Sequence, residues 1–89
     1  MAYRIELSPA AQRDIKRSPS QVVPLVEAAV LSLENDAYPP GVRKVIGEKS
    51  VWRVRVGSYR IIYEIHQDES LLVILKVEKR GESTYKRLK

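Results

Sequence analysis

The sequence predicts an α+β fold formed by a single domain, residues 1–89: a small antiparallel β-sheet with two N-terminal helices packed on one face and a short C-terminal helix or tail. The length of 89 residues suits one small domain. Apolar residues recur at helical spacing in the first half of the chain. In the second half they alternate with polar residues or form short runs, which is typical of strands.

The N-terminal segment predicts a short strand followed by a helix. Residues 3–7 alternate between apolar and charged side chains. Ser8 and Pro9 then supply an N-cap and a proline at the first helical position, so we expect a helix that ends near Arg17. The residues expected to pack from this helix are Ala10, Ala11 and Ile15.

A second helix is predicted between the Ser/Pro-rich residues 18–20 and Asn35. Pro24 has no backbone N–H to donate, so it belongs in the first turn of this helix or marks a kink. The two helices are expected to form an antiparallel hairpin that covers one face of the sheet. The apolar stripe of the second helix consists of Val22, Val26, Ala29, Val30 and Leu33.

Residues 51–65 predict a β-hairpin. Gly57-Ser58 lies between two runs of β-branched and aromatic residues, and glycine first in a two-residue loop suits a type II′ turn. This turn pairs Arg55 with Arg60 and Trp52 with Tyr63. Because side chains alternate between faces, one face is apolar and is expected to pack against the helices. The apolar face consists of Trp52, Val54, Val56, Tyr59, Ile61 and Tyr63. The opposite face carries Arg53, Arg55 and Arg60.

Residues 71–80 predict the last strand, and its early part is apolar on both faces, as in a central strand. A five-residue turn, 66–70, is expected to pair Ile65 with Leu71, which places Lys76 opposite Arg60. The core-facing residues of this strand are then Leu71, Val73, Leu75 and Val77. Five basic residues from three adjacent strands are expected to share one face: Arg53, Arg55, Arg60, Lys76 and Arg80.

Charge is distributed unevenly along the chain. The net charge is +5, but residues 1–42 hold four Lys/Arg against five Asp/Glu, a net of −1, whereas residues 43–89 hold twelve against six, a net of +6. Like charges opposite each other destabilise a sheet, so Arg55 beside Arg60 is a cost that an anion can relieve. A basic sheet face therefore indicates a phosphate backbone as partner.

Several classes of function are disfavoured by composition. The chain has no cysteine, a single histidine and no Gly-rich phosphate loop, so neither a metal site nor an organic cofactor is expected. No apolar run approaches the roughly 20 residues of a membrane span, and the first residues do not form a signal peptide. We expect a cytoplasmic protein. A lone histidine at a turn, His66, is more often solvated than catalytic.

A row of guanidinium groups can hold a phosphodiester and stabilise charge in its transition state. RNA supplies its own nucleophile, the 2′-hydroxyl, so a protein can promote cleavage largely by alignment. The alternative interpretation is structural. Arg53 and Arg55 are then polar positions of a half-exposed strand, Tyr85 anchors the C-terminal tail, and the other arginines form ion pairs. Those pairs would join Arg60 and Arg80 to Glu64, Glu78 or Glu82.

Residues 52–65 resemble the central signature of the RelE/ParE superfamily of bacterial toxins, and residues 77–85 resemble its closing x-R-x-x-x-x-Y element. In the RelE branch this resemblance implies a ribosome-dependent, metal-independent endoribonuclease that cuts messenger RNA in the decoding A site. The cleavage leaves a 2′,3′-cyclic phosphate and a 5′-hydroxyl. The resemblance also implies a cognate RelB-like antitoxin that forms a hetero-oligomer with the toxin and blocks its basic face.

The resemblance assigns roles to individual residues. Arg60 and Arg80 stabilise the transition-state phosphate, Arg80 also as leaving-group acid, and Tyr85 stacks on the substrate nucleotide. Arg55 falls where well-studied members have lysine, and arginine cannot act as a base, so we expect Arg55 to hold phosphate. The base is then the ribosome, water, or a carboxylate such as Glu78 or Glu82. The expected RNA-binding residues are Arg43, Lys44, Arg53, Lys76, Lys79 and Lys86.

Two other functions stay open. Members of the ParE branch bind and poison DNA gyrase and have no nuclease activity. A non-catalytic nucleic-acid-binding module would use the basic face for backbone contacts alone. Retention of Arg60, Arg80 and Tyr85 together favours the nuclease branch.

Overall fold

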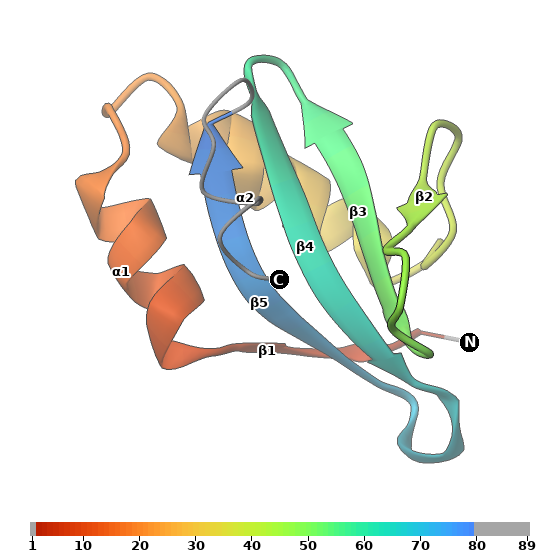
Figure 1. The fold of residues 1–89 in the computed structure, drawn as a ribbon. Coiled ribbons are helices and arrows are strands. Elements are labelled where there is room, and N and C mark those ends of the chain that lie inside the picture. The colour runs from red at the N-terminus through yellow and green to blue at the C-terminus, as the bar shows by residue number, and fades with distance from the viewer. Residues whose placement is uncertain (1, 80–89) are drawn as a thin grey trace.

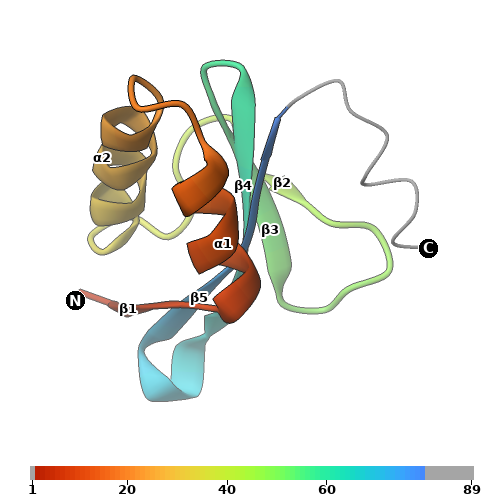
Figure 2. The same cartoon turned by 90° about the vertical axis from the view of Figure 1, so that its left-hand side faces the viewer.

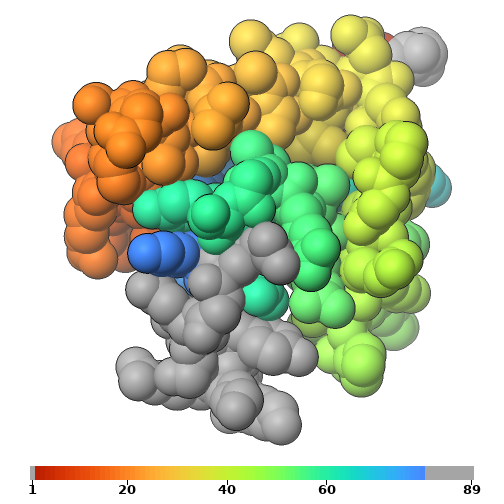
Figure 3. Space-filling model, turned by 90° about the horizontal axis from the view of Figure 1, so that it is seen from above, coloured from red at the N-terminus to blue at the C-terminus, as the bar shows by residue number. Residues whose placement is uncertain are grey.

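The computed structural model of the protein describes residues 2–79. Within them, five strands form one sheet in the order β1-β5-β4-β3-β2 (Figure 1). Two helices lie on one side of this sheet (Figure 2), and the space-filling view shows them as a continuous orange and yellow layer beside the green strands (Figure 3). The strands are β1 (Arg4–Leu7), β2 (Arg43–Lys44), β3 (Val51–Val56), β4 (Tyr59–His66) and β5 (Leu71–Lys79). The helices are α1 (Pro9–Arg17) and α2 (Val23–Leu33), with a short 3₁₀ turn at Gln67–Glu69.

Helix α1 begins and ends as predicted, and it is fixed to the edge of β5. The Ser8 hydroxyl accepts the Ala11 N–H at 3.1 Å and donates to the Leu75 carbonyl at 3.0 Å. One turn further on, the Asp14 carboxylate accepts the Val77 N–H at 3.0 Å. The free edge of β5 beyond β1 is therefore hydrogen-bonded to the start and middle of the helix, which holds α1 against the sheet.

Helix α2 carries Pro24 in its first turn, as predicted, and ends at Leu33, two residues before the predicted Asn35. Its apolar stripe packs on the sheet, with Val26 and Leu33 almost fully buried. Opposite them lies the predicted apolar face of the hairpin, including the fully buried Ile61 and Tyr63. None of the helices in the described part of the chain is long and apolar enough to cross a membrane.

The register of the β3–β4 hairpin is confirmed. Gly57 has a positive φ of 58°, as the first position of the predicted turn requires. Arg55 pairs with Arg60, and Trp52 pairs with Tyr63. Trp52 packs against the core on the helix side. The arginines therefore project from the opposite face of the sheet.

The sheet is mixed rather than antiparallel, because β1 pairs with β5 in parallel, Arg4 with Leu71 and Leu7 with Ile74. Hairpin connections force neighbouring strands to run antiparallel, but the first and last strands share no hairpin. Their relative direction is set instead by α1, which continues from β1 along the same edge of β5.

The predicted register of β4 with β5 is wrong by two residues at Arg60. His66 stays in β4 and pairs with Leu71, and the connection ends at Ser70, whose φ of 50° is left-handed. A β-bulge at Ile62/Tyr63 then leaves Leu75 as the extra residue. As a result Arg60 pairs with Glu78, not Lys76. Of the predicted core residues of β5, Leu71 and Val77 are buried, as predicted, whereas Leu72 and Ile74 take core positions in place of Val73 and Leu75, which are only partly buried.

Candidate nucleic-acid interface

The candidate interface is the face of the sheet turned away from the helices, called here the distal face. Paired residues share a face, so the register places four arginines on it. Arg43 pairs with Arg53 across β2 and β3, and Arg55 pairs with Arg60 across β3 and β4. The distal-face arginines thus form two like-charged cross-strand pairs on three neighbouring strands. Such a concentration favours an anionic partner.

Among the four distal-face arginines, Arg60 is the one for which the structure describes an ion pair. Its side chain is 16% exposed, and its Nε lies 3.7 Å from Oε2 of Glu78, whose side chain is 5% exposed. The predicted structural alternative, an ion pair between Arg60 and Glu78, is therefore present in the fold. Arg55, by contrast, is exposed. The sheet thus presents one accessible guanidinium beside a second that is held close to a buried carboxylate.

Lys76 pairs with Ile62 and so belongs to the distal face by register. Its ammonium, however, lies 3.5 Å from the Asp14 carboxylate, at the edge where α1 meets β5. Asp14 therefore binds both the Val77 N–H and the Lys76 ammonium. The charge of Lys76 is largely compensated there, so the predicted cluster is centred on the β2–β4 arginines and not on β5.

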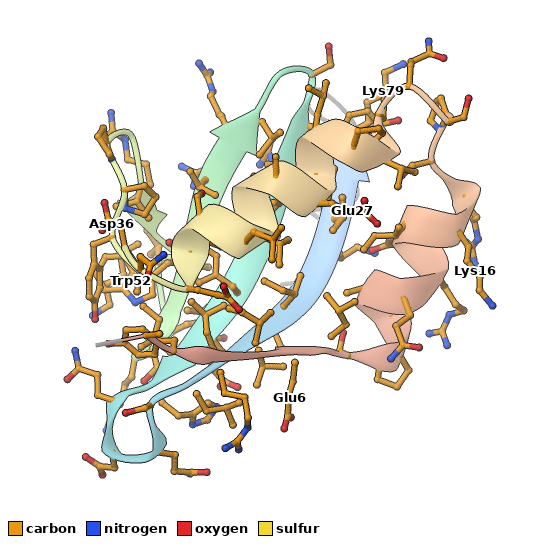
Figure 4. The ribbon with its side chains drawn as sticks, turned by 180° about the vertical axis from the view of Figure 1, so that it is seen from behind. Glu6, Lys16, Glu27, Asp36, Trp52 and Lys79 are labelled. Atoms are coloured by element: carbon orange, nitrogen blue, oxygen red, sulfur yellow. The ribbon has the colours of Figure 1, made fainter. Side chains whose placement is uncertain are left out.

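Two predicted RNA-binding lysines lie elsewhere. Lys44 pairs with Trp52, and its ammonium is 5.7 Å from the centre of the Trp52 ring, within reach of a cation–π interaction. Lys79 pairs with Tyr59, which belongs to the core-facing side. Both Trp52 and Lys79 are labelled in Figure 4, where α2 lies in front of the sheet. The register therefore separates both lysines from the distal-face arginines.

Three predicted site residues, Arg80, Tyr85 and Lys86, lie outside the described residues. Within residues 2–79 no group of three or more His, Asp or Glu side chains is arranged to hold a metal ion.

The lone histidine has a partner that sequence reasoning missed. His66 Nε2 lies 2.9 Å from Oε1 of Glu64, and both side chains are about one-third exposed. His66 also lines a pocket of about 360 Å³ near the 3₁₀ turn. Tyr38 and Trp52 line the same pocket, with ring centres 5.1 Å apart in an edge-to-face arrangement. No local sequence signal indicates this pocket, because Tyr38 comes from the loop after α2.

Comparison with known proteins now identifies the family. The family model described as the ParE toxin of the type II toxin–antitoxin system parDE matches residues 5–84. The chain belongs to this toxin family. It is thereby a member of the RelE/ParE superfamily, as its hairpin and closing motif predicted. The toxin is 25% identical to the RelE1 protein of Methanocaldococcus jannaschii, over 97% of this chain and 98% of that protein.

Solved structures share the fold of the toxin. The archaeal RelE–RelB complex from Pyrococcus horikoshii matches with a TM-score of 0.80 and 25% identity, covering 92% of this chain and 99% of that one. The RelBE2 toxin–antitoxin complex from Mycobacterium tuberculosis matches with a TM-score of 0.81 and 23% identity, covering 90% and 100%. The isolated RelE toxin of E. coli matches at 0.79 and 15%, covering 98% and 94%. The arrangement of two helices on a five-stranded mixed sheet is therefore the RelE fold.

Proposed function

We propose that this toxin is a ribosome-dependent endoribonuclease that cleaves messenger RNA in the ribosomal A site and so inhibits translation. The observation that carries the proposal is the cross-strand pair of Arg55 and Arg60 on the distal face. Two guanidinium groups placed side by side suit the two non-bridging oxygens of a phosphodiester, which share its single negative charge, and bidentate contacts to phosphate are a property of arginine. Arg43 and Arg53 extend the same basic surface along the RNA backbone.

The proposed reaction uses the substrate's own nucleophile. The 2′-oxygen forms a bond to phosphorus as the bond from phosphorus to the 5′-oxygen breaks, which leaves a 2′,3′-cyclic phosphate and a 5′-hydroxyl. The 2′-hydroxyl gives its proton to a base, which is a ribosomal group, water or a carboxylate, and the departing 5′-oxygen takes a proton from Arg80, so protons and charge balance overall. Arg55 and Arg60 stabilise the extra charge on the phosphorane oxygens. Arg80 and Tyr85 are proposed to act as leaving-group acid and stacking platform, respectively.

We further propose that a RelB-like antitoxin binds the toxin in the cytoplasm and neutralises it as a hetero-oligomer. The relatives from Pyrococcus horikoshii and Mycobacterium tuberculosis were solved as RelE–RelB and RelBE2 complexes, respectively. A partner that covers the distal face has to offset the net +6 of residues 43–89. An acidic segment is therefore the expected occupant of this face.

The decisive experiment maps cleavage sites on messenger RNA with and without ribosomes. The proposal expects cleavage that requires ribosomes and leaves cyclic phosphate ends. Arg60→Gln should slow cleavage by about 10²-fold or more, in line with the loss of one transition-state donor. Arg13→Gln, which removes the same charge from exposed α1, should cleave normally. Cleavage of free RNA to the same extent, or an active Arg60→Gln protein, would overturn the assignment.

A second candidate function follows from the matched family, whose description names ParE. In that case the toxin inhibits DNA gyrase without cutting RNA. A supercoiling assay with purified gyrase separates the two functions, since a nuclease leaves supercoiling intact and a gyrase inhibitor abolishes it. If the protein neither cuts RNA nor inhibits gyrase but still binds RNA, it is a non-catalytic binding module.

A further inference from the structure

Glu78 is the buried acidic residue of the described chain, and it lies on the distal face of β5. The residue is 6% exposed, and one carboxylate oxygen, Oε1, has no hydrogen-bond partner. Burying a carboxylate is costly unless other groups compensate its charge. The other oxygen, Oε2, is 3.7 Å from Arg60 Nε. A buried, partly unsatisfied carboxylate beside a proposed active-site arginine calls for an explanation.

The depth of the two side chains indicates which one supports the other. Glu78 is 5% exposed at its side chain and Arg60 16%, so the carboxylate is the more deeply buried partner. Their backbones are paired directly across β4 and β5, which fixes the carboxylate relative to the base of the arginine. A separation of 3.7 Å is longer than a hydrogen bond between nitrogen and oxygen. The contact between Glu78 and the Arg60 Nε is therefore an ion pair and not a hydrogen bond.

We propose that Glu78 is a positioning residue, which orients the Arg60 guanidinium toward the scissile phosphate through its contact with Nε. The inference rests on the proposed nuclease function. An arginine side chain has many rotamers, and aligning it before the substrate arrives removes an entropic cost from the transition state. Glu78 also lowers the positive potential at Arg60. The lowered potential does not favour the binding of RNA, whereas the alignment of Arg60 favours the transition state. We therefore expect Glu78 to contribute to the chemical step and not to the binding of RNA.

The test compares single-turnover cleavage by wild-type toxin and Glu78→Gln on ribosomes programmed with messenger RNA. The cleavage rate should fall about 10-fold or more, while the affinity for the programmed ribosome is unchanged or higher. Glu64→Gln is the matched control, because Glu64 is a carboxylate of the neighbouring strand β4 whose side chain contacts His66 and not an arginine. It should cleave as fast as the wild type.

A double variant shows whether Glu78 acts through Arg60. If it does, Glu78→Gln has no further effect on cleavage in an Arg60→Gln background, as expected for two residues that work as one unit. If the two losses multiply, Glu78 acts independently and the positioning role is wrong. If Glu78→Gln cleaves at the wild-type rate, or faster, the carboxylate is structural or inhibitory and the inference fails.

A measurement that needs no substrate keeps this inference separate from the proposed function. The NMR signal of the Arg60 Nε–H should report a more mobile side chain in Glu78→Gln than in the wild type. If Glu78→Gln does not fold, Glu78→Met, which keeps a similar length without the carboxylate, replaces it in both experiments. A wild-type toxin that cleaves no RNA overturns the nuclease function, whereas unchanged Arg60 mobility overturns the positioning role.

Discussion

Arg55 and Arg60 are direct cross-strand partners in the β3–β4 hairpin, so two positive charges face each other on the sheet. Like charges in such a position destabilise the pair by roughly 0.2–1 kcal/mol. A pair that suits the proposed binding of phosphate is therefore unfavourable for the stability of the fold. We expect Arg55→Gln to raise the free energy of unfolding by about this amount, measured by urea denaturation.

The same substitution should weaken RNA binding. Log affinity falls as log salt concentration rises, and the loss of one phosphate contact with single-stranded RNA makes this slope shallower by about 0.7. Arg13→Gln on α1 removes an equal charge away from the distal face and should leave both the slope and the stability unchanged. An Arg55→Gln protein that binds RNA with the wild-type salt dependence would show that Arg55 contacts no phosphate.

The Tyr63 hydroxyl donates a hydrogen bond to the Ala37 carbonyl at 2.8 Å, and the tyrosine is fully buried. This bond ties β4 to the loop that follows α2. Tyr63→Phe removes the donor and leaves the carbonyl unsatisfied, so the free energy of unfolding should fall by about 1–3 kcal/mol. Tyr38→Phe is the control, because its bond with Gln67 is exposed. A loss as large in Tyr38→Phe would contradict the role of burial.

Alkaline pH should destabilise the protein through the same residue. Burial, with added repulsion from Tyr38 and Asp36, raises the pKa of Tyr63 well above its ordinary value. The folded state therefore holds this proton more tightly than the unfolded chain does. The corresponding stability is complete below about pH 10, where unfolded tyrosine is protonated, and is lost as the pH rises further. Urea denaturation at about pH 9 and about pH 11 should show a smaller loss in Tyr63→Phe than in the wild type.

Asp14 should govern the attachment of α1 to the sheet. Its carboxylate accepts the Val77 N–H and lies 3.5 Å from the Lys76 ammonium. Asp14→Ala leaves both groups without this partner, so we expect a loss of about 1–3 kcal/mol in stability and faster hydrogen exchange at the Val77 amide. Asp68→Ala, in the exposed 3₁₀ turn, should change neither quantity. Unchanged exchange at Val77 would mean that the bond to Asp14 does not protect this amide.

The elements that were predicted correctly are those with a local signal in the sequence. Ser8-Pro9 marks the start of α1, and Gly57-Ser58 sets the hairpin register by turn geometry. The face that carries Arg53, Arg55 and Arg60 follows from that register alone. These features depend only on residues within a few positions of each other, so their physics can be read without the rest of the fold.

The features that were missed depend on distant or cooperative contacts. The partner of Arg60 changed from Lys76 to Glu78 because a left-handed Ser70 and a β-bulge each shift the register by one residue. Neither position contains glycine, so the sequence does not mark them. The parallel pairing of β1 with β5 likewise joins segments that are distant in the chain, Arg4 with Leu71 and Leu7 with Ile74. A strand pattern alone does not specify such a neighbour.

The position of β5 has a consequence for the folding of the protein during its synthesis. This strand follows the other four in the chain, yet it lies between β1 and β4 in the sheet. During synthesis, β1 therefore cannot pair with β5 until residues 71–79 have left the exit tunnel. The pair of Arg60 and Glu78 cannot form earlier either. A nascent chain that is still short of this strand cannot complete its sheet, so the central part of the distal face is assembled only after β5 has emerged.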